Sequence, residues 1–265
     1  MSRRRTERLI VTKVTADGAR RGPDRLIVEE PMTIQLDGVT VSTTMRTPGH
    51  DFELAVGFCQ NEGLLGGAPV EAIKYCGTGS AVETEFNVVS VDTSGRAPVP
   101  SPRLGTTSSS CGWCGSDQID ELTERLAPLE STEPFDLDVL AGIPDSVRSK
   151  QALFGDTGAV HAAAAFDRSG SVRLVREDVG RHNAVDKVVG AMLLAGDVPA
   201  HDLGLFVSGR ASVEMVQKAW AAGFSAVVAV SAPTSLAVSA ARRANLLLAG
   251  FVTGDAFNVY SPERL

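Results

Sequence analysis

Two cysteines, Cys111 and Cys114, lie three positions apart in the stretch Cys-Gly-Trp-Cys-Gly. Thiols at this spacing can share a metal ion, form a disulfide or pass sulfur between them. The pair follows a loop rich in Ser, Thr, Pro, Gly and Arg and precedes a predicted short helix over 117–126. The free N–H groups at the start of a helix stabilise a thiolate, so the position favours a reactive thiol. The alternative is a pair of buried structural cysteines without chemistry.

The surroundings of this pair argue against zinc. A structural zinc site needs four ligands, and the other two cysteines, Cys59 and Cys76, are single. Zinc deaminases place a His-x-Glu before their Cys-x-x-Cys, whereas His161 comes after it. A thioredoxin-like redox pair follows a strand of a βαβ unit, and this pair follows a loop. We therefore predict no metal site and no zinc.

Three turns near the end of the chain combine small residues with a predicted helix start or strand end. They are Ser208-Gly209-Arg210, residues 231–235, and Thr253-Gly254-Asp255. In open α/β sheets, ligands bind at the carboxyl ends of the strands, and helix N-termini there suit a phosphate. Arg210 can add a fork of N–H donors. The turns thus favour a nucleotide-like anion, and the alternative is ordinary helix capping.

A third polar cluster is Glu177-Asp178-Val179-Gly180-Arg181-His182-Asn183, which stands before a predicted helix. Two acids, an Arg and a His at one junction make it a candidate site, with Arg181 and His182 as candidate cofactor-binding residues. The alternative is a solvated helix start. His161, in a run of small residues, is interpreted as a buried histidine satisfied by its neighbours.

The first ninety residues predict a strand-rich part. A hairpin is expected over Ile34–Thr43 around Asp37-Gly38, because Asp-Gly suits a tight turn with positive φ. A helix is expected over 51–64, and strands over 73–76 and 82–91. We divide the chain into the strand-rich part at 1–91, a flexible loop bearing the Cys-x-x-Cys at 92–116, and an α/β domain at 117–265.

The α/β domain is expected to begin with helical sequence over 136–154, broken at Gly142 and Pro144, and strands at 160–166 and 172–175. Helices and strands then alternate. Alternation of this kind predicts a mostly parallel sheet covered by helices on both faces, a three-layer αβα arrangement. The expected elements are helices at 183–194, 212–222 and 235–245 and strands at 203–207, 226–230 and 246–252.

Composition limits the class of protein. The 265 residues are 43% hydrophobic and 22% charged, which is typical of a globular chain. A net charge of −7 argues against binding to nucleic acid or to an anionic membrane. Arg3-Arg4-Arg5 precedes no apolar stretch of signal-peptide length, so we interpret it as a solvated tail of a cytoplasmic protein.

Taken together, these stretches resemble the FdhD family of formate dehydrogenase accessory proteins. The resemblance runs from about Leu26 to the end of the chain and rests on seven motifs in order rather than on any one of them. The motifs are Met45–Gly49, Cys111–Gly115, Thr157–Ala163, Arg176–Lys187, Ser208–Gln217, Ser231–Ser239 and Gly250–Tyr260.

The resemblance implies a sulfurtransferase that carries sulfur from a cysteine desulfurase to the molybdenum bis(molybdopterin guanine dinucleotide) cofactor of formate dehydrogenase. It implies that Cys111 holds the persulfide and that Cys114 assists. It also implies a cytidine-deaminase-like fold without the zinc signature, and a homodimer. The C-terminal segment expected to touch the cofactor is Phe251, Val252, Thr253, Gly254, Asp255 and Ala256.

Two other functions remain open on the residues alone. One is a chaperone that binds the cofactor through its guanine nucleotide without transferring sulfur. The other is a thiol–disulfide oxidoreductase, which requires a reversible disulfide between Cys111 and Cys114.

Overall fold

The computed structural model describes residues 4–76, 80–99, 124, 126–130, 133–254 and 256–261. Cys111, Cys114, Asp255 and most of the predicted loop at 92–116 lie outside these ranges. The division of the chain at residues 91 and 117 stays a prediction.

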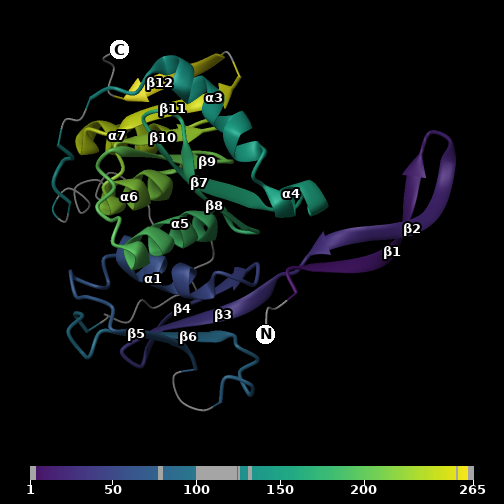
Figure 1. Cartoon of the computed structure of the whole chain (residues 1–265), viewed down its shortest axis with the longest axis horizontal. Helices are drawn as coiled ribbons and strands as arrows, with labels where there is room; N and C mark the ends of the chain where they lie inside the picture. Colours follow the sequence, from purple (N-terminus) through teal and green to yellow (C-terminus); the bar gives the residue numbers. More distant parts are fainter. Residues whose placement is uncertain are drawn as a thin grey trace.

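A six-stranded sheet forms the centre of the described chain, with the strand order β12-β11-β10-β9-β7-β8 (Figure 1). Three helices cover one face and α3 covers the other, so the part has three layers. The strands are β7 (His161–Asp167), β8 (Val172–Asp178), β9 (Leu203–Val207), β10 (Ala226–Ala229), β11 (Leu247–Thr253) and β12 (Ala256–Ser261). The helices are α3 (Leu137–Arg148), α4 (Ala152–Thr157), α5 (Arg181–Ala195), α6 (Val213–Ala222) and α7 (Ser235–Ala244).

Small residues in the central strands let helices approach both faces of this sheet. Along β7, Ala163 and Ala165 belong to the core beneath α5, α6 and α7, while Ala162 and Ala164 belong to the core beneath α3. Successive side chains of a strand point to opposite faces, so a strand buried on both sides is apolar throughout.

The prediction of a mostly parallel sheet is wrong. Only β9 with β10 and β10 with β11 pair in parallel, whereas β7 is antiparallel to both β8 and β9, and β12 is antiparallel to β11. The physical reason is the length of the connections. Short turns join β7 to β8 and β11 to β12, and a short turn can return the chain only in the opposite direction.

A second, four-stranded sheet lies beyond the helices, in the order β4-β3-β6-β5. Its strands are β3 (Glu30–Leu36), β4 (Val39–Arg46), β5 (Ala72–Tyr75) and β6 (Val88–Asp92). The predicted hairpin is confirmed, with Asp37 at φ 47 and Gly38 at φ 83 between β3 and β4. The strand predicted over 82–91 is too long, because residues 81–86 form a turn.

Helix α1 (Asp51–Asn61) joins the two sheets, packing on β3 and β6 on one side and on α5 on the other (Figure 1). The two helices cross in backbone contact. A Cβ on Gly57 would collide with the carbonyl oxygen of Asp186, and a Cβ on Gly190 would collide with that of Glu53. Glycine at both positions is therefore required for this crossing.

The first strands were missed in the sequence. β1 (Thr6–Thr15) and β2 (Gly18–Ile27) pair antiparallel into a hairpin that projects from the body (Figure 1), and we call it the arm. The interpretation of the basic start as a solvated tail is wrong at Arg5. Its side chain lies against Gly49, and burial lowers the pKa of its guanidinium although Glu177 and Asp178 act to raise it.

Candidate functional site

The carboxyl ends of β9, β10 and β11 lie at one edge of the six-stranded sheet, because these three strands are parallel. β7 runs the other way, so its first residue, His161, reaches the same edge. β8 is antiparallel to β7, and its last residue, Asp178, lies opposite His161. The first two predicted turns therefore lie at the same edge of the sheet as His161 and the start of α5.

The turns at this edge are joined by backbone hydrogen bonds. Ser231 N donates to Gly209 O over 3.4 Å, and Phe251 N donates to Ser231 O over 3.2 Å. Ala211 adds a bridge to Pro233. The turn at 208–210 thus lies beside the turn at 231–235. β11 joins them at Phe251, two residues before Thr253.

Ser208 connects this edge to β7. Its Oγ accepts a hydrogen bond from Ala162 N over 2.9 Å and lies 3.3 Å from His161 Nδ1. His161 is half-buried rather than buried, and it is hydrogen-bonded as interpreted from the sequence. Burial lowers the pKa of its imidazole, and the nearby Arg181 and His182 lower it further.

Positive charge collects around Gly209. A Cβ added there would lie 3.5 Å from His161 Cε1 and 3.8 Å from Arg181 Cδ, so both side chains border this residue. The Arg181 Nε is buried and has no hydrogen-bond partner in the described part of the chain. Arg210 is exposed, and no described carboxylate pairs with it. Two guanidinium groups therefore have N–H donors left for an anion.

Helix N-termini add further donors. The N-cap of α5, Gly180, and the N-cap of α6, Ser212, make no side-chain capping hydrogen bond. At α7 the cap is made, since Thr234 accepts from Ala237 N over 3.2 Å. The N–H groups at the start of α5 carry partial positive charge, which suits a phosphate, whereas the Glu214 carboxylate already occupies the first turn of α6.

His182 and Glu214 form a pair that the sequence did not reveal. His182 Nε2 lies 3.7 Å from Glu214 Oε2, and the Ser212 hydroxyl donates to the same carboxylate over 2.5 Å. The contact with His182 does most to hold the pKa of Glu214 at about 2, and burial opposes it. His182 Nδ1 is buried and unpaired among the described residues. An acidic residue in the first turn of a helix is common, so the sequence carried no signal for this pair.

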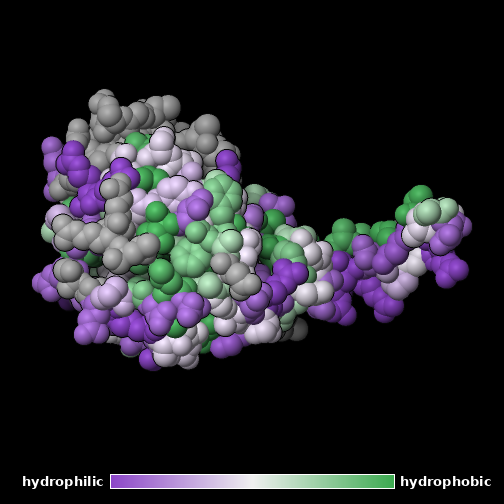
Figure 2. Space-filling view, turned by 90° about the horizontal axis from the view of Figure 1, so that it is seen from above, coloured by the Kyte–Doolittle hydropathy of each residue, from purple (hydrophilic) through white to green (hydrophobic). Residues whose placement is uncertain are grey.

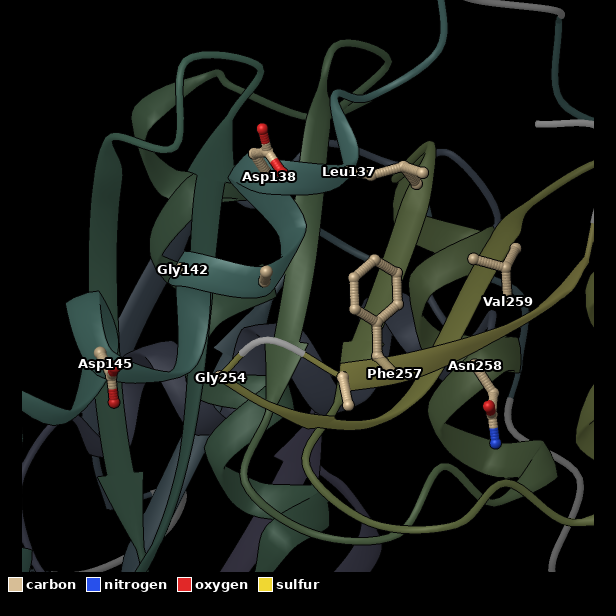
Figure 3. Close-up of a pocket in the computed structure, with 10 residues that line it drawn as sticks. Leu137, Asp138, Gly142, Asp145, Gly254, Phe257, Asn258 and Val259 are labelled. Atoms are coloured by element: carbon tan, nitrogen blue, oxygen red, sulfur yellow. The ribbon is translucent and has the colours of Figure 1, made fainter.

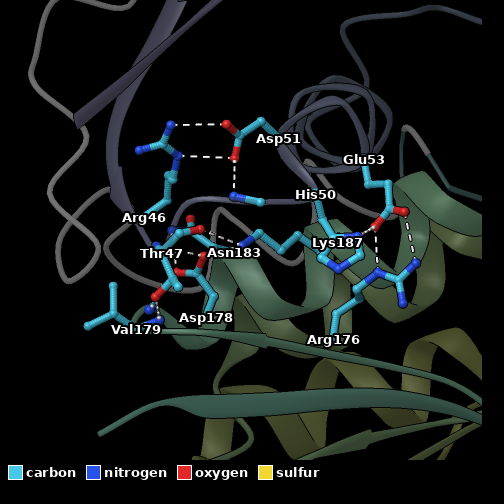
Figure 4. A network of polar contacts seen from close by, with 12 residues as sticks. Arg46, Thr47, His50, Asp51, Glu53, Arg176, Asp178, Val179, Asn183 and Lys187 are labelled. Atoms are coloured by element: carbon cyan, nitrogen blue, oxygen red, sulfur yellow. Dashed lines mark hydrogen bonds and ion pairs between the residues drawn. The ribbon is translucent and has the colours of Figure 1, made fainter. Parts of the chain in front are cut away.

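Much of the cluster at 177–183 is structural, which corrects its interpretation as one site. Lys187 Nζ donates to Asp178 Oδ2 over 2.6 Å and to Thr47 O over 2.9 Å, and both charged side chains are fully buried (Figure 4). Asn183 donates to Asp178 Oδ1 and to Met45 O. These contacts tie the Met45–Gly49 motif to the start of α5 and leave Arg181 and His182 at the edge.

Two further ion pairs flank this network (Figure 4). Arg46 donates to both carboxylate oxygens of Asp51, over 3.1 and 3.0 Å, and both side chains are fully buried. Arg176 donates to Glu53 over 2.5 and 2.8 Å. Burial acts to raise the pKa of Glu53, but the hydrogen bonds from Arg176 and His50 hold it at about 2.

Of the two cysteines in the described part of the chain, one is excluded from thiol chemistry. Cys59 is fully buried on α1, and burial raises the pKa of its thiol to about 12. A thiol that stays protonated is a poor nucleophile. The predicted pair, Cys111 and Cys114, lies outside the described ranges.

The C-terminal segment borders a groove on the other face of the sheet. Gly254 and Ala256 line it together with Phe257 and α3, around a cavity volume of about 990 Å³ (Figure 3). Phe251 adopts a positive φ of 56 and is 47% exposed, and Val252 is buried in the core beneath α3. The segment expected to touch the cofactor is therefore split between the strand-end edge, the core and the groove.

Neither a metal centre nor a membrane span emerges from the described residues. No group of three or more His, Cys, Asp or Glu side chains in these ranges is arranged to hold a metal ion. The helices found there lack the length and apolar character that a bilayer crossing requires.

Comparison with known proteins extends over nearly the whole chain. The family model described as the FdhD/NarQ family matches residues 27–265. The sulfur carrier protein FdhD of Nocardia farcinica is 45% identical over 98% of this chain and 95% of its own. That of Streptomyces avermitilis is 44% identical over the same shares. A solved structure of a candidate formate dehydrogenase accessory protein from Desulfotalea psychrophila has a TM-score of 0.79, with 23% identity, over 99% of this chain and all of that one.

Proposed function

Because the chain belongs to the FdhD/NarQ family, we propose that it is a cytoplasmic sulfur carrier that serves a formate dehydrogenase. In this proposal it takes sulfur from a cysteine desulfurase and delivers it to the molybdenum bis(molybdopterin guanine dinucleotide) cofactor. The support is the identity of 41–45% with curated sulfur carrier proteins over nearly the full length. A homodimer and a cytidine-deaminase-like fold belong to the same proposal.

Cys111 is the sulfur-carrying residue in this mechanism. Its thiolate attacks the terminal sulfur of the desulfurase persulfide. A new S–S bond forms on Cys111, the old S–S bond breaks, and the desulfurase cysteine leaves as a thiolate. Cys114 assists the later release of that sulfur. Cys59 cannot substitute, since its thiol is buried and protonated.

The edge around Gly209 is the part of the described chain best suited to the guanine dinucleotide. Arg181 and Arg210 offer charge-assisted donors, and the uncapped start of α5 offers backbone N–H groups. The buried Arg181 Nε and His182 Nδ1 support the assignment, because neither atom has a hydrogen-bond partner among the described residues.

Chain length allows Cys111 and Cys114 to reach this edge. Ala127 O accepts from Trp220 Nε1 over 2.7 Å, which anchors the chain near the end of α6. Ala127 follows Cys114 by 13 positions, and such a segment spans up to about 45 Å when extended. α6 has 10 residues and is therefore about 15 Å long. The distance from its end to its start, at Ser212, is well within that span.

Intact-mass measurement tests the proposal. The protein is incubated with a cysteine desulfurase and cysteine, and a gain of one sulfur atom, removed by a thiol reductant, is expected on the wild type and absent in Cys111→Ala. A cofactor-binding chaperone would gain no sulfur yet keep its affinity for guanine nucleotide. A thiol–disulfide oxidoreductase would instead lose two hydrogen atoms, that is two protons and two electrons passed to a disulfide oxidant, in a reversible disulfide.

A further inference from the structure

The arm formed by β1 and β2 is exposed over most of its length. From Leu9 to Asp24, every residue except Val11 and Gly22 is exposed. At its base Arg25 pairs with Asp156 of α4 over 2.5 Å. A two-stranded hairpin alone is marginally stable at best in water. The arm therefore needs a surface that covers it.

Both strands of the arm carry exposed apolar and basic residues. β1 carries Leu9, Ile10 and Val14, which are 44%, 62% and 77% exposed. β2 carries Arg20, Arg21 and Arg25. Figure 2 shows hydrophobic residues along one side of the arm and hydrophilic residues along the other. An exposed apolar edge strand invites pairing with another strand.

The groove beside α3 has the complementary chemistry (Figure 3). Its apolar lining includes Leu137, Phe257 and Val259, and its acidic lining is Asp138 and Asp145. β12, which supplies one wall, is the last strand of its sheet, so its outer edge pairs with no strand of the described chain. The groove thus offers an apolar floor, negative charge and a free strand edge.

Charge favours a second copy of the chain as the occupant. Residues 4–27 hold seven Lys and Arg but three Asp and Glu, although the whole chain has a net charge of −7. The remainder is accordingly acidic, and it includes the groove. Within one chain the arm points away from α3 and β12, so it cannot fill its own groove (Figure 1).

We propose that the arm of one copy docks in the groove between α3 and the β11–β12 hairpin of a second copy, and that the exchange is reciprocal. Reciprocal exchange closes the pair around a two-fold axis and uses each arm and each groove once. β1 then lies along β12, and the face of the arm that carries Arg8 and Arg21 turns towards Asp138 and Asp145. This deepens the homodimer of the proposed function and does not depend on sulfur transfer.

Charge exchange between two variants tests the pairing by analytical ultracentrifugation. Arg8→Glu with Arg21→Glu places acids on that face of the arm, and Asp138→Lys with Asp145→Lys places bases in the groove. Each variant alone should be monomeric, with a dimer dissociation constant raised about a hundredfold or more. An equal mixture should dimerise again, because both interfaces of the mixed dimer are then complementary.

The control is Lys74→Glu with Arg243→Glu, which makes the same charge change at two exposed residues away from the arm and groove. It should dimerise like the wild type. A monomeric wild type, variants that stay dimeric, or a mixture that stays monomeric would each overturn the proposal. The proposal would also be overturned if guanosine diphosphate protected the groove from hydrogen exchange while the arm variant left that protection unchanged. Sulfur loading of the same samples, read by intact mass, reports separately on the proposed function.

Discussion

Lys187 Nζ lies 2.6 Å from Asp178 Oδ2, with both side chains fully buried between the N-terminal sheet and the α/β layers. Burial lowers the pKa of Lys187, while the Asp178 carboxylate acts to raise it. Asp178 also accepts from Thr47 N and Gly180 N. The pair thus joins the motif before α1 to the start of α5, directly behind the candidate site.

Removal of this lysine should destabilise the fold. Lys187→Ala leaves a buried carboxylate without its cation, which costs about 3–5 kcal/mol. The free energy of unfolding in urea measures the loss. The matched control is Lys13→Ala, which breaks the exposed pair with Asp24 and should cost under about 1 kcal/mol. Equal losses in the two variants would show that burial of the pair does not matter.

The acid stability of the fold should depend on Glu53. Its pKa is about 2 in the folded protein and about 4.5 when unfolded, so its ionised form favours folding at any pH above 4.5. That contribution is lost as pH falls from about 4.5 towards 2. We expect Glu53→Gln to lower the free energy of unfolding at pH 7 and to reduce its fall between those values. If the free energy of unfolding of variant and wild type fell in parallel with pH, the ion pair of Glu53 with Arg176 would not be the cause of the acid sensitivity.

Cys111→Ala should abolish sulfur loading and the activation of formate dehydrogenase. Cys114→Ala should impair activation less, because it removes an assisting thiol and not the carrier. Formate dehydrogenase activity in cells that hold each variant is the measurement, with Cys59→Ala as the control for a buried thiol. Full maturation of the enzyme by Cys111→Ala protein would refute the carrier role of this residue.

Guanosine diphosphate should stabilise the protein against heat. A ligand that binds only the folded state adds about 2.7 kcal/mol at a concentration one hundred times its dissociation constant. Adenosine diphosphate should do markedly less if the site reads the edge of the guanine base. Thermal shifts of equal size for the two nucleotides would indicate a site that binds phosphate alone.

Arg210→Ala should weaken nucleotide binding about tenfold or more, since a lost charge-assisted hydrogen bond costs roughly 1.5–3 kcal/mol. Calorimetric titration measures the affinity. Arg243→Ala is the matched control, because Arg243 is also exposed but lies in the last turn of α7, at the helix end away from the site. If both variants bind as the wild type does, Arg210 makes no contact with the ligand.

The sequence predicted the elements of the α/β part well, because their periods and turns are local signals. The boundaries of β9 and α6 came within one residue. The break expected at Gly142 and Pro144 is wrong, since α3 continues through both and ends at Arg148. Its buried stripe of Leu140, Ile143 and Val147 packs beneath the sheet and outweighs the cost of an internal proline.

The arm could not be predicted from hydrophobic alternation. Neither face of β1 or β2 is buried in this chain, so no period of two marks the strands.

The site was only partly predictable. Parallel strands imply that the turns at 208 and 231 meet, but the place of His161 depends on the register of β7 against β9. Register is set by packing across the whole sheet and leaves no trace in one segment.

The contact of α1 with α5 through Gly57 and Gly190 bears on how the protein unfolds. These helices approach so closely that even a small separation would remove the backbone contact between them. A chain cut near residue 91 would also leave Lys187, and Lys218 beside Asp186, facing water where α1 now covers them. The N-terminal sheet and the six-stranded sheet should therefore unfold in a single transition, with no intermediate in which one sheet is folded and the other is not.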